Sequence, residues 1–179
     1  MEKLKPKAIT VRLVVIEDDQ VLLVHEKGDQ FSSKPAGWGL PGGGLDGKNA
    51  EELVMSIRRF LPIQSRVPPE QVEAMMFTIL DFTTDIALDV FLVGVKEGIE
   101  ETGLVIRPEK KLFEIQNSPE HTIVVVRGNI LGGTLSTRNT ETDDCRWFSL
   151  ETLPQGLYVS HERMIRRTMN ILSLSSGTK

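Results

Sequence analysis

Three carboxylates within five residues, just before a glycine, constrain this chain more than any other feature of its sequence. They are Glu97, Glu100 and Glu101, and Gly103 follows them. If the segment from about Asp85 to Thr102 is a helix, the three stand at i, i+3 and i+4 on one face. Like charges at this spacing repel, and a bound divalent cation would offset the repulsion. Carboxylate oxygens suit a hard ion such as Mg2+ or Mn2+.

The same residues also fit a solvated acidic helix face that ends at a glycine C-cap. A second motif bears on this choice: the segment 38–46 reads Trp-Gly-Leu-Pro-Gly-Gly-Gly-Leu-Asp. The pattern predicts a short strand from Trp38 to Leu40. Pro41 lacks a backbone donor and the glycines that follow have a free backbone, so the strand must end there.

Composition limits the function classes. A length of 179 residues, with 40% hydrophobic and 26% charged residues, is typical of one globular domain. The net charge of −4 argues against a general nucleic-acid surface or an anionic membrane as partner. Cys145 is the sole cysteine, so no intramolecular disulfide forms, and no cysteine and histidine cluster has zinc spacing. No apolar run reaches 18 residues and no signal segment is present, which predicts a cytoplasmic protein.

Apolar periodicity predicts the order of elements. Residues Ala8–Ile16 and Val21–His25 are β-branched runs that predict a hairpin. Asn49 predicts the start of a helix that Pro62 breaks. Pro68 to Gln71 predicts the first turn of a second helix, and Thr84-Asp85 could cap the third, which carries the carboxylates.

Strands return after Gly103. They are expected at Leu112–Ile115, at Thr122–Val126 continuing to Ile130, and at Arg146–Phe148. Ser160 predicts the cap of a last helix. A hairpin first and a helix last indicate an α/β (α+β) fold, with a mixed β-sheet and helices on its faces.

Together, the glycine-rich motif and the acidic motif resemble the Nudix hydrolase signature, G-x5-E-x7-R-E-U-x-E-E-x-G-U, in which U is aliphatic. The resemblance is split. Residues 44 to 95 separate the two halves where the signature has far fewer, so about 39 residues are inserted. The resemblance spans roughly residues 7–48 and 86–173. It implies one domain over 1–179, an α/β/α sandwich around a mixed sheet, with a helical insertion at about 49–84.

The resemblance also implies a function. Nudix hydrolases cleave the pyrophosphate of a nucleoside diphosphate derivative by Mg2+-assisted attack of water. The implied metal ligands are Glu97, Glu100, Glu101 and Glu141. The implied catalytic residues are Lys96, Glu97 and Glu101, and the glycine loop that approaches the substrate is Gly42, Gly43 and Gly44.

Three positions depart from the signature. Lys96 stands for arginine, which keeps the charge but loses the bidentate fork. Gly98 stands for the aliphatic residue, and glycine inside a helix costs about 1 kcal/mol relative to alanine. The first glutamate has no clean match, because counting from Gly43 reaches Asn49 and counting back from Lys96 reaches Leu88, beside Asp89.

Several alternatives stay open. A catalytically silent Nudix-fold protein that binds or senses a nucleotide is the rival to a hydrolase. The small-molecule nucleotide substrate is ADP-ribose-like or a nucleoside triphosphate, and dinucleoside polyphosphates remain open. The spacing of Pro119 is similar to that of ADP-ribose-type members of the family, but Ser118-Pro119 is also an ordinary turn dipeptide. The insertion forms a helical subdomain beside the active site or a contact in a homodimer. The partial matches to dinucleotide and P-loop motifs fail, because Pro41 prevents a helix start and no Ser or Thr follows Lys48.

Overall fold

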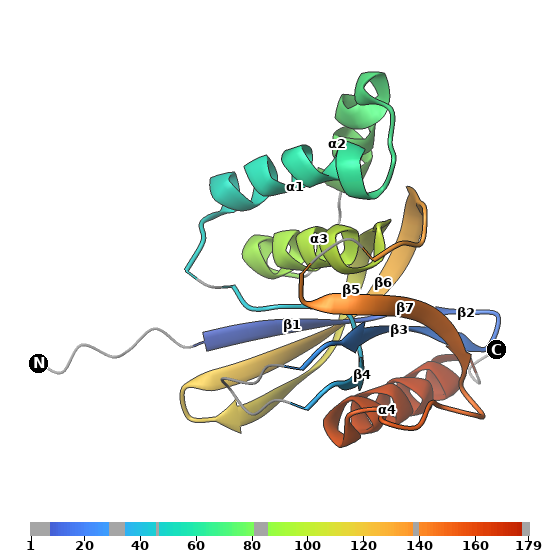
Figure 1. Cartoon of the computed structure of the whole chain (residues 1–179). Helices are drawn as coiled ribbons and strands as arrows, with labels where there is room; N and C mark the ends of the chain where they lie inside the picture. Colours follow the sequence, from blue (N-terminus) through green and yellow to red (C-terminus); the bar gives the residue numbers. More distant parts are fainter. Residues whose placement is uncertain (1–7, 29–34, 46, 81–85, 138–139, 177–179) are drawn as a thin grey trace, which may run out of the picture.

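The computed structural model describes residues 8–28, 35–45, 47–80, 86–137 and 140–176. Within these ranges the elements and their bounds are β1 Ala8–Val14, β2 Ile16–Glu17, β3 Gln20–Glu26, β4 Gly37–Gly39, α1 Ala50–Gln64, the 3-10 helix η1 Pro69–Gln71, α2 Val72–Leu80, α3 Leu88–Thr102, β5 Leu104–Ser118, β6 His121–Gly133, β7 Thr142–Ser149 and α4 Val159–Ser176 (Figure 1).

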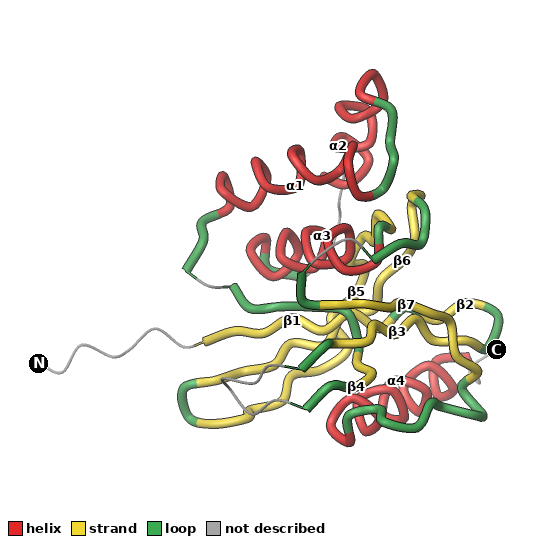
Figure 2. The backbone as a smooth tube through the Cα atoms, viewed as in Figure 1, coloured by secondary structure: helices red, strands yellow, loops and turns green. Residues whose placement is uncertain are grey.

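The strands form two sheets (Figure 2). One has the order β1-β6-β5, with β1 parallel to β6 and β5 antiparallel to β6. In the other, β3 pairs antiparallel with β2, β4 and β7. The predicted mixture of strand directions is therefore confirmed. The division into two sheets was not part of the prediction.

The predicted hairpin of Ala8–Ile16 with Val21–His25 is wrong for most of its length. Only β2 pairs with β3, whereas β1 pairs with the distant β6. Asp18 and Asp19, both at positive φ, form the tight turn between β2 and β3, a conformation that suits the twist of a two-residue hairpin. Apolar runs predict strands but do not specify a distant partner.

Helices cover both faces of the strands, as the predicted sandwich requires. In Figure 1, α3 lies above the strands and α4 below them. Two hydrophobic clusters match these layers. One joins α1, α2 and α3 to β1, β5 and β6, through residues such as Ile57, Phe91 and Val105. The other joins α4 to the opposite face, through Val14, Val125 and Ile165.

The predicted insertion contains α1, η1 and α2. Asn49 caps α1 as predicted: its side chain accepts from the Glu52 amide, and Glu52 returns a bond to the Asn49 amide. Pro62, however, does not end the helix, which continues to Gln64. The prediction of a break there was wrong, because packing of the helix on the core outweighs the local cost of a proline in its last turn.

Three other predicted boundaries shift. Helix α3 begins at Leu88 with Ala87 as its N-cap, which forms no side-chain cap bond; the predicted cap at Thr84-Asp85 lies outside the described residues. Helix α4 begins at Val159, so Ser160 lies inside it and does not cap it. Strands β5 and β6 are longer than predicted because they pair along almost their whole length. No helix in the described part of the chain is long and apolar enough to cross a membrane.

Candidate active site

Helix α3 holds the three carboxylates close to the sheet. Three of its apolar residues, Phe91, Val95 and Ile99, are fully buried. Gly94 and Gly98 lie one turn apart on the side that faces β5. A methyl group at Gly98 would come within 3.1 Å of the Ile106 Cβ, and one at Gly94 within 2.8 Å of the Pro108 Cγ. The departure at Gly98 thus has a structural reason: it lets the helix lie closer to β5 than a side chain would allow.

The helix ends where the sequence predicts. Gly103 has φ of 69° and donates its amide to the carbonyl of Ile99, an ending that glycine adopts without the steric cost of a Cβ. Thr102 donates its hydroxyl to the Gly98 carbonyl at 2.6 Å. This ending places Glu97, Glu100 and Glu101 in the last two turns of α3.

The glycine loop lies against both β1 and α3. The amide of Val11 donates to the carbonyl of Gly43 at 2.9 Å, and that of Leu13 donates to Pro41 at 2.8 Å, so the loop follows the edge of β1. The amide of Gly42 points the other way and donates to Glu101 Oε2 at 2.8 Å. A Cβ at Gly42 would lie 2.0 Å from the Val11 carbonyl oxygen. Only glycine fits at this position.

Gly43 makes room for the next carboxylate. A Cβ on Gly43 would lie 2.6 Å from the Glu97 Cδ and 2.7 Å from its Oε1. The carboxylate of Glu97 therefore rests against the loop backbone. Glu97 and Glu101 therefore contact neighbouring glycines of one loop. Gly44, the third glycine of the loop, pairs with Thr10 on β1.

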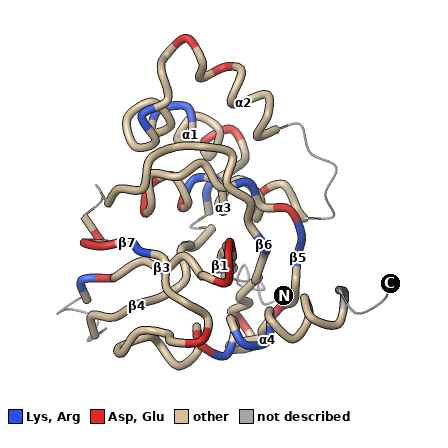
Figure 3. The backbone as a smooth tube through the Cα atoms, turned by 90° about the vertical axis from the view of Figure 1, so that its right-hand side faces the viewer, with Lys and Arg blue, Asp and Glu red and all other residues tan. Residues whose placement is uncertain are grey.

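Lys96 lies between the carboxylates of Glu97 and Glu100. Its Nζ donates to Glu97 Oε1 and to Glu100 Oε2, both at 2.8 Å. The three side chains are 11%, 15% and 19% exposed, so these ion pairs are largely shielded from water. Figure 3 shows acidic and basic positions close together around α3. The structure thus supplies a local counter-ion for two of the three carboxylates.

Burial sets the charge balance of the cluster. Burial, followed by the nearby charge of Glu97, raises the pKa of Glu101 to about 8, against the opposing effects of the Gly42 amide and Arg12. Burial also raises the pKa of Glu97, although Lys96 opposes the shift. Burial lowers the pKa of Lys96, but Glu97 and Glu100 outweigh it, so that pKa is raised.

Glu141, just before β7, belongs to the same neighbourhood. Its negative charge adds to the raised pKa of Glu97, and its carbonyl accepts the Lys27 amide at 3.0 Å. Glu141 is therefore close enough to Glu97 for the two charges to interact, although the two residues come from distant segments. The sequence separation of Glu141 from the others is 40 residues or more.

The chemistry of these donors fits a hard divalent cation. The side-chain donor atoms are oxygens, and the contacts of the Lys96 ammonium show that Glu97 and Glu100 accept a cation between them. Among the residues that the structure describes, however, no group of three or more His, Cys, Asp or Glu side chains is arranged so that it could hold a metal ion. Lys96 holds two of the carboxylates and the Gly42 amide holds the third, so binding requires side chains to rearrange.

Neither candidate for the missing first glutamate is placed with the cluster. The side chain of Asn49 caps the N-terminus of α1. Asp89 accepts the Val90 amide at 2.8 Å in the first turn of α3. It lies eight residues before Glu97, which corresponds to about 12 Å along a helix.

Sequence reasoning missed a cavity on the other side of the glycine loop. The cavity has a volume of about 380 Å3, and Arg12, Glu26 and Tyr158 line it. Arg12 donates to the carbonyls of Leu40 and Gly42, at 3.2 and 2.9 Å. Gly42 therefore connects this cavity to Glu101. The one available signal was an arginine inside the apolar run of β1.

The histidines have structural partners. His161 is buried and its Nδ1 accepts the Leu40 amide at 2.8 Å, which fixes the strand before the glycine loop to α4. His121 bonds Thr10 across the β1–β6 pair, and His25 lies 2.6 Å from Asp143.

No protein-family model and no curated protein sequence matches the chain. Solved structures do. An ADP-ribose pyrophosphatase from Streptococcus suis is 23% identical, with a TM-score of 0.53 over 90% of each chain. A MutT NUDIX hydrolase from Burkholderia pseudomallei is 16% identical, with a TM-score of 0.55 over 91% of this chain and 98% of that one.

A NUDIX hydrolase from Nitrosomonas europaea is 12% identical, with a TM-score of 0.60 over 94% of this chain and 73% of that one. Such identities establish a shared fold. They agree with the predicted sandwich of helices around a mixed set of strands. The chain has the fold of the Nudix hydrolases.

Proposed function

We propose that the protein is a Nudix hydrolase that cleaves a pyrophosphate bond in a nucleoside diphosphate derivative, with Mg2+ or Mn2+ as cofactor. The observation that carries this proposal is the placement of Glu97 and Glu101 against Gly43 and Gly42. Burying charged carboxylates is costly, and helix statistics alone give no reason to gather them beside a loop that has no side chains. Residues with such raised pKa values often mark functional sites.

Different residues of the chain would bind the cation, contact the pyrophosphate and accept the proton. Glu97, Glu100, Glu101 and Glu141 would hold the cation, which neutralises charge on the phosphate oxygens and acidifies water. The backbone of Gly42 to Gly44 would lie against the pyrophosphate. The oxygen of water bonds to one phosphorus, the bridging oxygen leaves with the electron pair of its bond, and a carboxylate accepts the proton of the water. Glu97 and Glu101 are the carboxylates proposed for that last role.

The cavity beside Gly42 supports a substrate larger than inorganic pyrophosphate. Its volume of about 380 Å3 is in the range of small-molecule sites. Arg12 supplies a cation, while Glu26 and Tyr158 supply polar atoms suited to hydroxyl groups. ADP-ribose-like molecules, the substrate class in the description of one solved neighbour, and nucleoside triphosphates are both proposed substrates. A homodimer and a cytoplasmic location remain predictions.

A product assay tests the proposal. Purified protein with Mg2+ or Mn2+ would be incubated with ADP-ribose, NADH, diadenosine polyphosphates and nucleoside triphosphates, both canonical and oxidised, and products identified by mass spectrometry. We expect cleavage at a pyrophosphate bond of at least one compound, and no cleavage with a chelator present. Absence of metal-dependent cleavage from the whole panel, at high protein concentration, would contradict the enzyme proposal.

A specific observation keeps a second function open. Lys96 already neutralises Glu97 and Glu100, and no first glutamate joins the cluster among the residues that the structure describes. Both features suit a protein that binds a nucleotide without cleaving it. Thermal stabilisation by one compound of the panel, with no product formed, would support this binding function instead.

A further inference from the structure

The guanidinium group of Arg12 holds the glycine loop with only one of its nitrogens. Its Nη1 donates to the carbonyl of Leu40 at 3.2 Å and to the carbonyl of Gly42 at 2.9 Å. Nε and Nη2 also carry N–H donors, and no acceptor for them is found among the residues that the structure describes. The structure therefore leaves these donors of Arg12 for a ligand.

The guanidinium lies beside the cavity and close to the acidic turn of α3. Arg12 is the one lysine or arginine among the described residues that line this cavity. Burial and the charge of Glu26 raise the pKa of Tyr158, and the charge of Arg12 opposes this shift. Burial and Glu97 raise the pKa of Glu101, and Arg12 opposes that shift too. Arg12 is therefore close enough to both Tyr158 and Glu101 for its charge to act on them.

We propose that the cavity binds a phosphorylated sugar and that Arg12 recognises the phosphate, with Nε and Nη2 donating to phosphate oxygens while Nη1 holds the glycine loop. The inference rests on the proposed function, because it takes the sugar phosphate to be part of a nucleoside diphosphate derivative. It goes further by assigning one residue to the phosphate and by making a charged phosphate a requirement of the cavity. It involves no metal ion.

Two features of the cavity favour an anion. A planar guanidinium offers paired donors that match the oxygens of a phosphate. Helix α4 begins at Val159, and the residues Val159, Ser160 and His161 line the same cavity. The N-terminus of a helix carries partial positive charge and amides that lack a helical acceptor, so it also favours an anion. The arginine and the helix therefore both add positive potential to the cavity.

Glu26 limits what the rest of the ligand can be. Glu26 lines the cavity and is 9% exposed, and a carboxylate accepts hydrogen bonds without donating any. It would repel a second anionic group and would accept the hydroxyl groups of a sugar. Tyr158 donates its hydroxyl to the carbonyl of Pro35 at 2.8 Å, so its oxygen is left as an acceptor. The lining therefore suits a ligand with one anionic group and several hydroxyl groups.

The role of Arg12 in holding the loop must be separated from its role in binding. Without Arg12, the carbonyls of Leu40 and Gly42 lose a donor, and a displaced loop would weaken the binding of every ligand of the cavity. Loss of a contact with phosphate would instead weaken the binding of phosphorylated ligands alone. The ratio of the affinities for a phosphorylated compound and its unphosphorylated form therefore reports phosphate recognition.

The experiment compares the binding of ADP with that of adenosine, and of ribose 5-phosphate with that of ribose, by nuclear magnetic resonance titration. A chelator is present, so that no divalent cation contributes to binding. The proteins are the wild type, Arg12→Met, Arg12→Lys and the matched control Arg166→Met. Arg166 is an exposed residue of α4 that pairs with Glu162 at 2.7 Å, so its variant removes the same charge outside the cavity.

We expect the wild type to bind each phosphorylated compound more tightly than its unphosphorylated form. Arg12→Met should reduce this ratio of affinities about 10- to 150-fold, the usual effect of losing a hydrogen bond to a charged group. Arg12→Lys keeps the charge but not the planar fork, so it should reduce the ratio by less. Arg166→Met should match the wild type.

A ratio that Arg12→Met leaves unchanged would overturn the inference, even if both affinities fall together. So would a wild type that shows no preference for the phosphorylated compounds. The proposed hydrolase would stand in both cases if the wild type cleaves a compound of the product assay. A preference that depends on Arg12, in a wild type that cleaves nothing, would support the inference and contradict the enzyme proposal. Arg12→Gln, whose amide can still donate to a loop carbonyl, repeats the comparison should the methionine variant fail to fold.

Discussion

The buried carboxyl of Glu101 makes the stability of the folded protein depend on pH. The side chain is 5% exposed, and burial, together with the charge of Glu97, raises its pKa to about 8. The folded protein therefore holds a proton there at pH values where the unfolded chain, with an ordinary pKa of 4.5, has lost it. Because the folded state binds more protons in this window, stability must fall as the pH rises from 4.5 to about 8.

Substitution of Glu101 by glutamine should remove this pH dependence. The glutamine side chain would keep an oxygen to accept the Gly42 amide and would carry no charge. We expect the metal-free variant to be more stable than the wild type at pH 8, with the slope reduced by up to about 1.4 kcal/mol per pH unit. Turnover should fall about 100-fold or more. Denaturant unfolding in chelator at several pH values, with the exposed Glu114→Gln as control, measures the first effect.

Substitution of Gly43 should lower cleavage activity while leaving the stability of the fold nearly unchanged. Gly43→Ala would place a Cβ 2.6 Å from the Glu97 Cδ. That atom is the end of a flexible side chain, so it can move, and we expect stability to change by less than about 1 kcal/mol. Cleavage activity should nevertheless fall at least about tenfold because Glu97 is displaced. Unchanged activity would show that the loop does not need to approach Glu97.

At the scale of elements, the spacing of the carboxylates and the glycine ending of α3 are readable from sequence because both are local. The approach of α3 to β5 is not readable, because it depends on contacts of Gly94 and Gly98 with Pro108 and Ile106. From the sequence alone, Gly98 is only a departure from the motif. The structure shows that its small size allows α3 to approach Ile106 of β5.

Replacing Gly98 by leucine, an aliphatic residue as in the motif, should therefore harm this chain. A Cβ alone would lie 3.1 Å from the Ile106 Cβ, and a leucine side chain adds three more carbons beside this close contact. We expect a loss of about 1–3 kcal/mol in unfolding free energy, the usual cost of overpacking. Gly98→Ala would gain about 1 kcal/mol in helix propensity against a milder clash. Thermal unfolding of both variants measures which of the two is more stable. A Gly98→Leu variant more stable than the wild type would contradict the close packing of α3 on β5.

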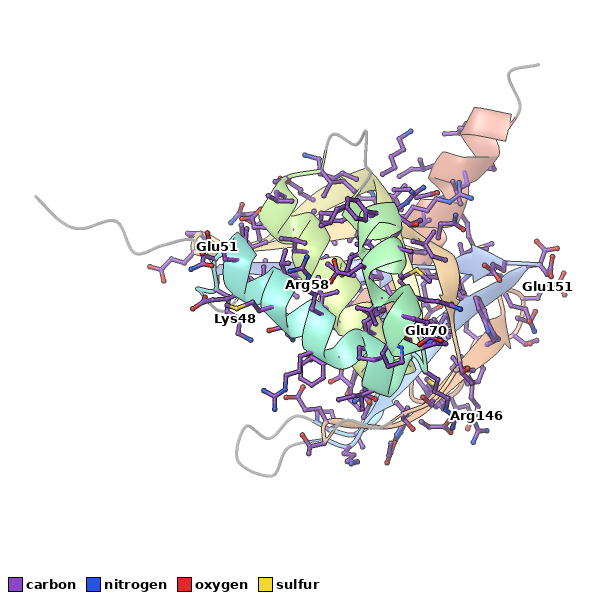
Figure 4. All side chains as sticks on the ribbon, turned by 90° about the horizontal axis from the view of Figure 1, so that it is seen from above. Lys48, Glu51, Arg58, Glu70, Arg146 and Glu151 are labelled. Atoms are coloured by element: carbon purple, nitrogen blue, oxygen red, sulfur yellow. The ribbon has the colours of Figure 1, made fainter. Side chains whose placement is uncertain are left out.

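At the scale of the whole molecule, the helices of the predicted insertion belong to the core. Leu53, Ile57 and Leu61 of α1 are at most 1% exposed and pack in the same cluster as α3. Figure 4, viewed from above, shows α1 lying over α3, with the labelled Glu51 in the first turn of α1 and the labelled Arg58 further along it. The helical structure of this segment could be predicted from capping and periodicity. The packing of its helices on the core could not be predicted, since it depends on contacts between segments far apart in sequence.

The insertion therefore supports the helix that carries the site. Ile57→Ala should lower the unfolding free energy by about 2–5 kcal/mol, because it leaves a cavity in the core. Phe77→Ala, on α2, is the matched control: Phe77 is 76% exposed, and its loss should change stability by less than about 0.5 kcal/mol. Denaturant unfolding of both variants tests this. Similar small effects at the two positions would mean that the insertion is a separate unit.

Sequence identified most of the candidate site, since the acidic turn and the glycine loop are short contiguous motifs. It did not show the cavity of Arg12, Glu26 and Tyr158, because β1, β3 and the start of α4 come together only in the folded chain. Nor did it show that Lys96 bridges two carboxylates, because lysine next to glutamate on a helix usually faces solvent.

The central claim is that the acidic turn of α3 performs metal-dependent pyrophosphate cleavage. The most direct measurement compares the cleavage rates of the wild type, Glu97→Gln and Glu114→Gln on the substrate that the product assay identifies, at fixed Mg2+. We predict a loss of about 100-fold or more for Glu97→Gln and none for Glu114→Gln. Near-normal Mg2+-dependent cleavage by folded Glu97→Gln would contradict the assignment of this turn as the active site.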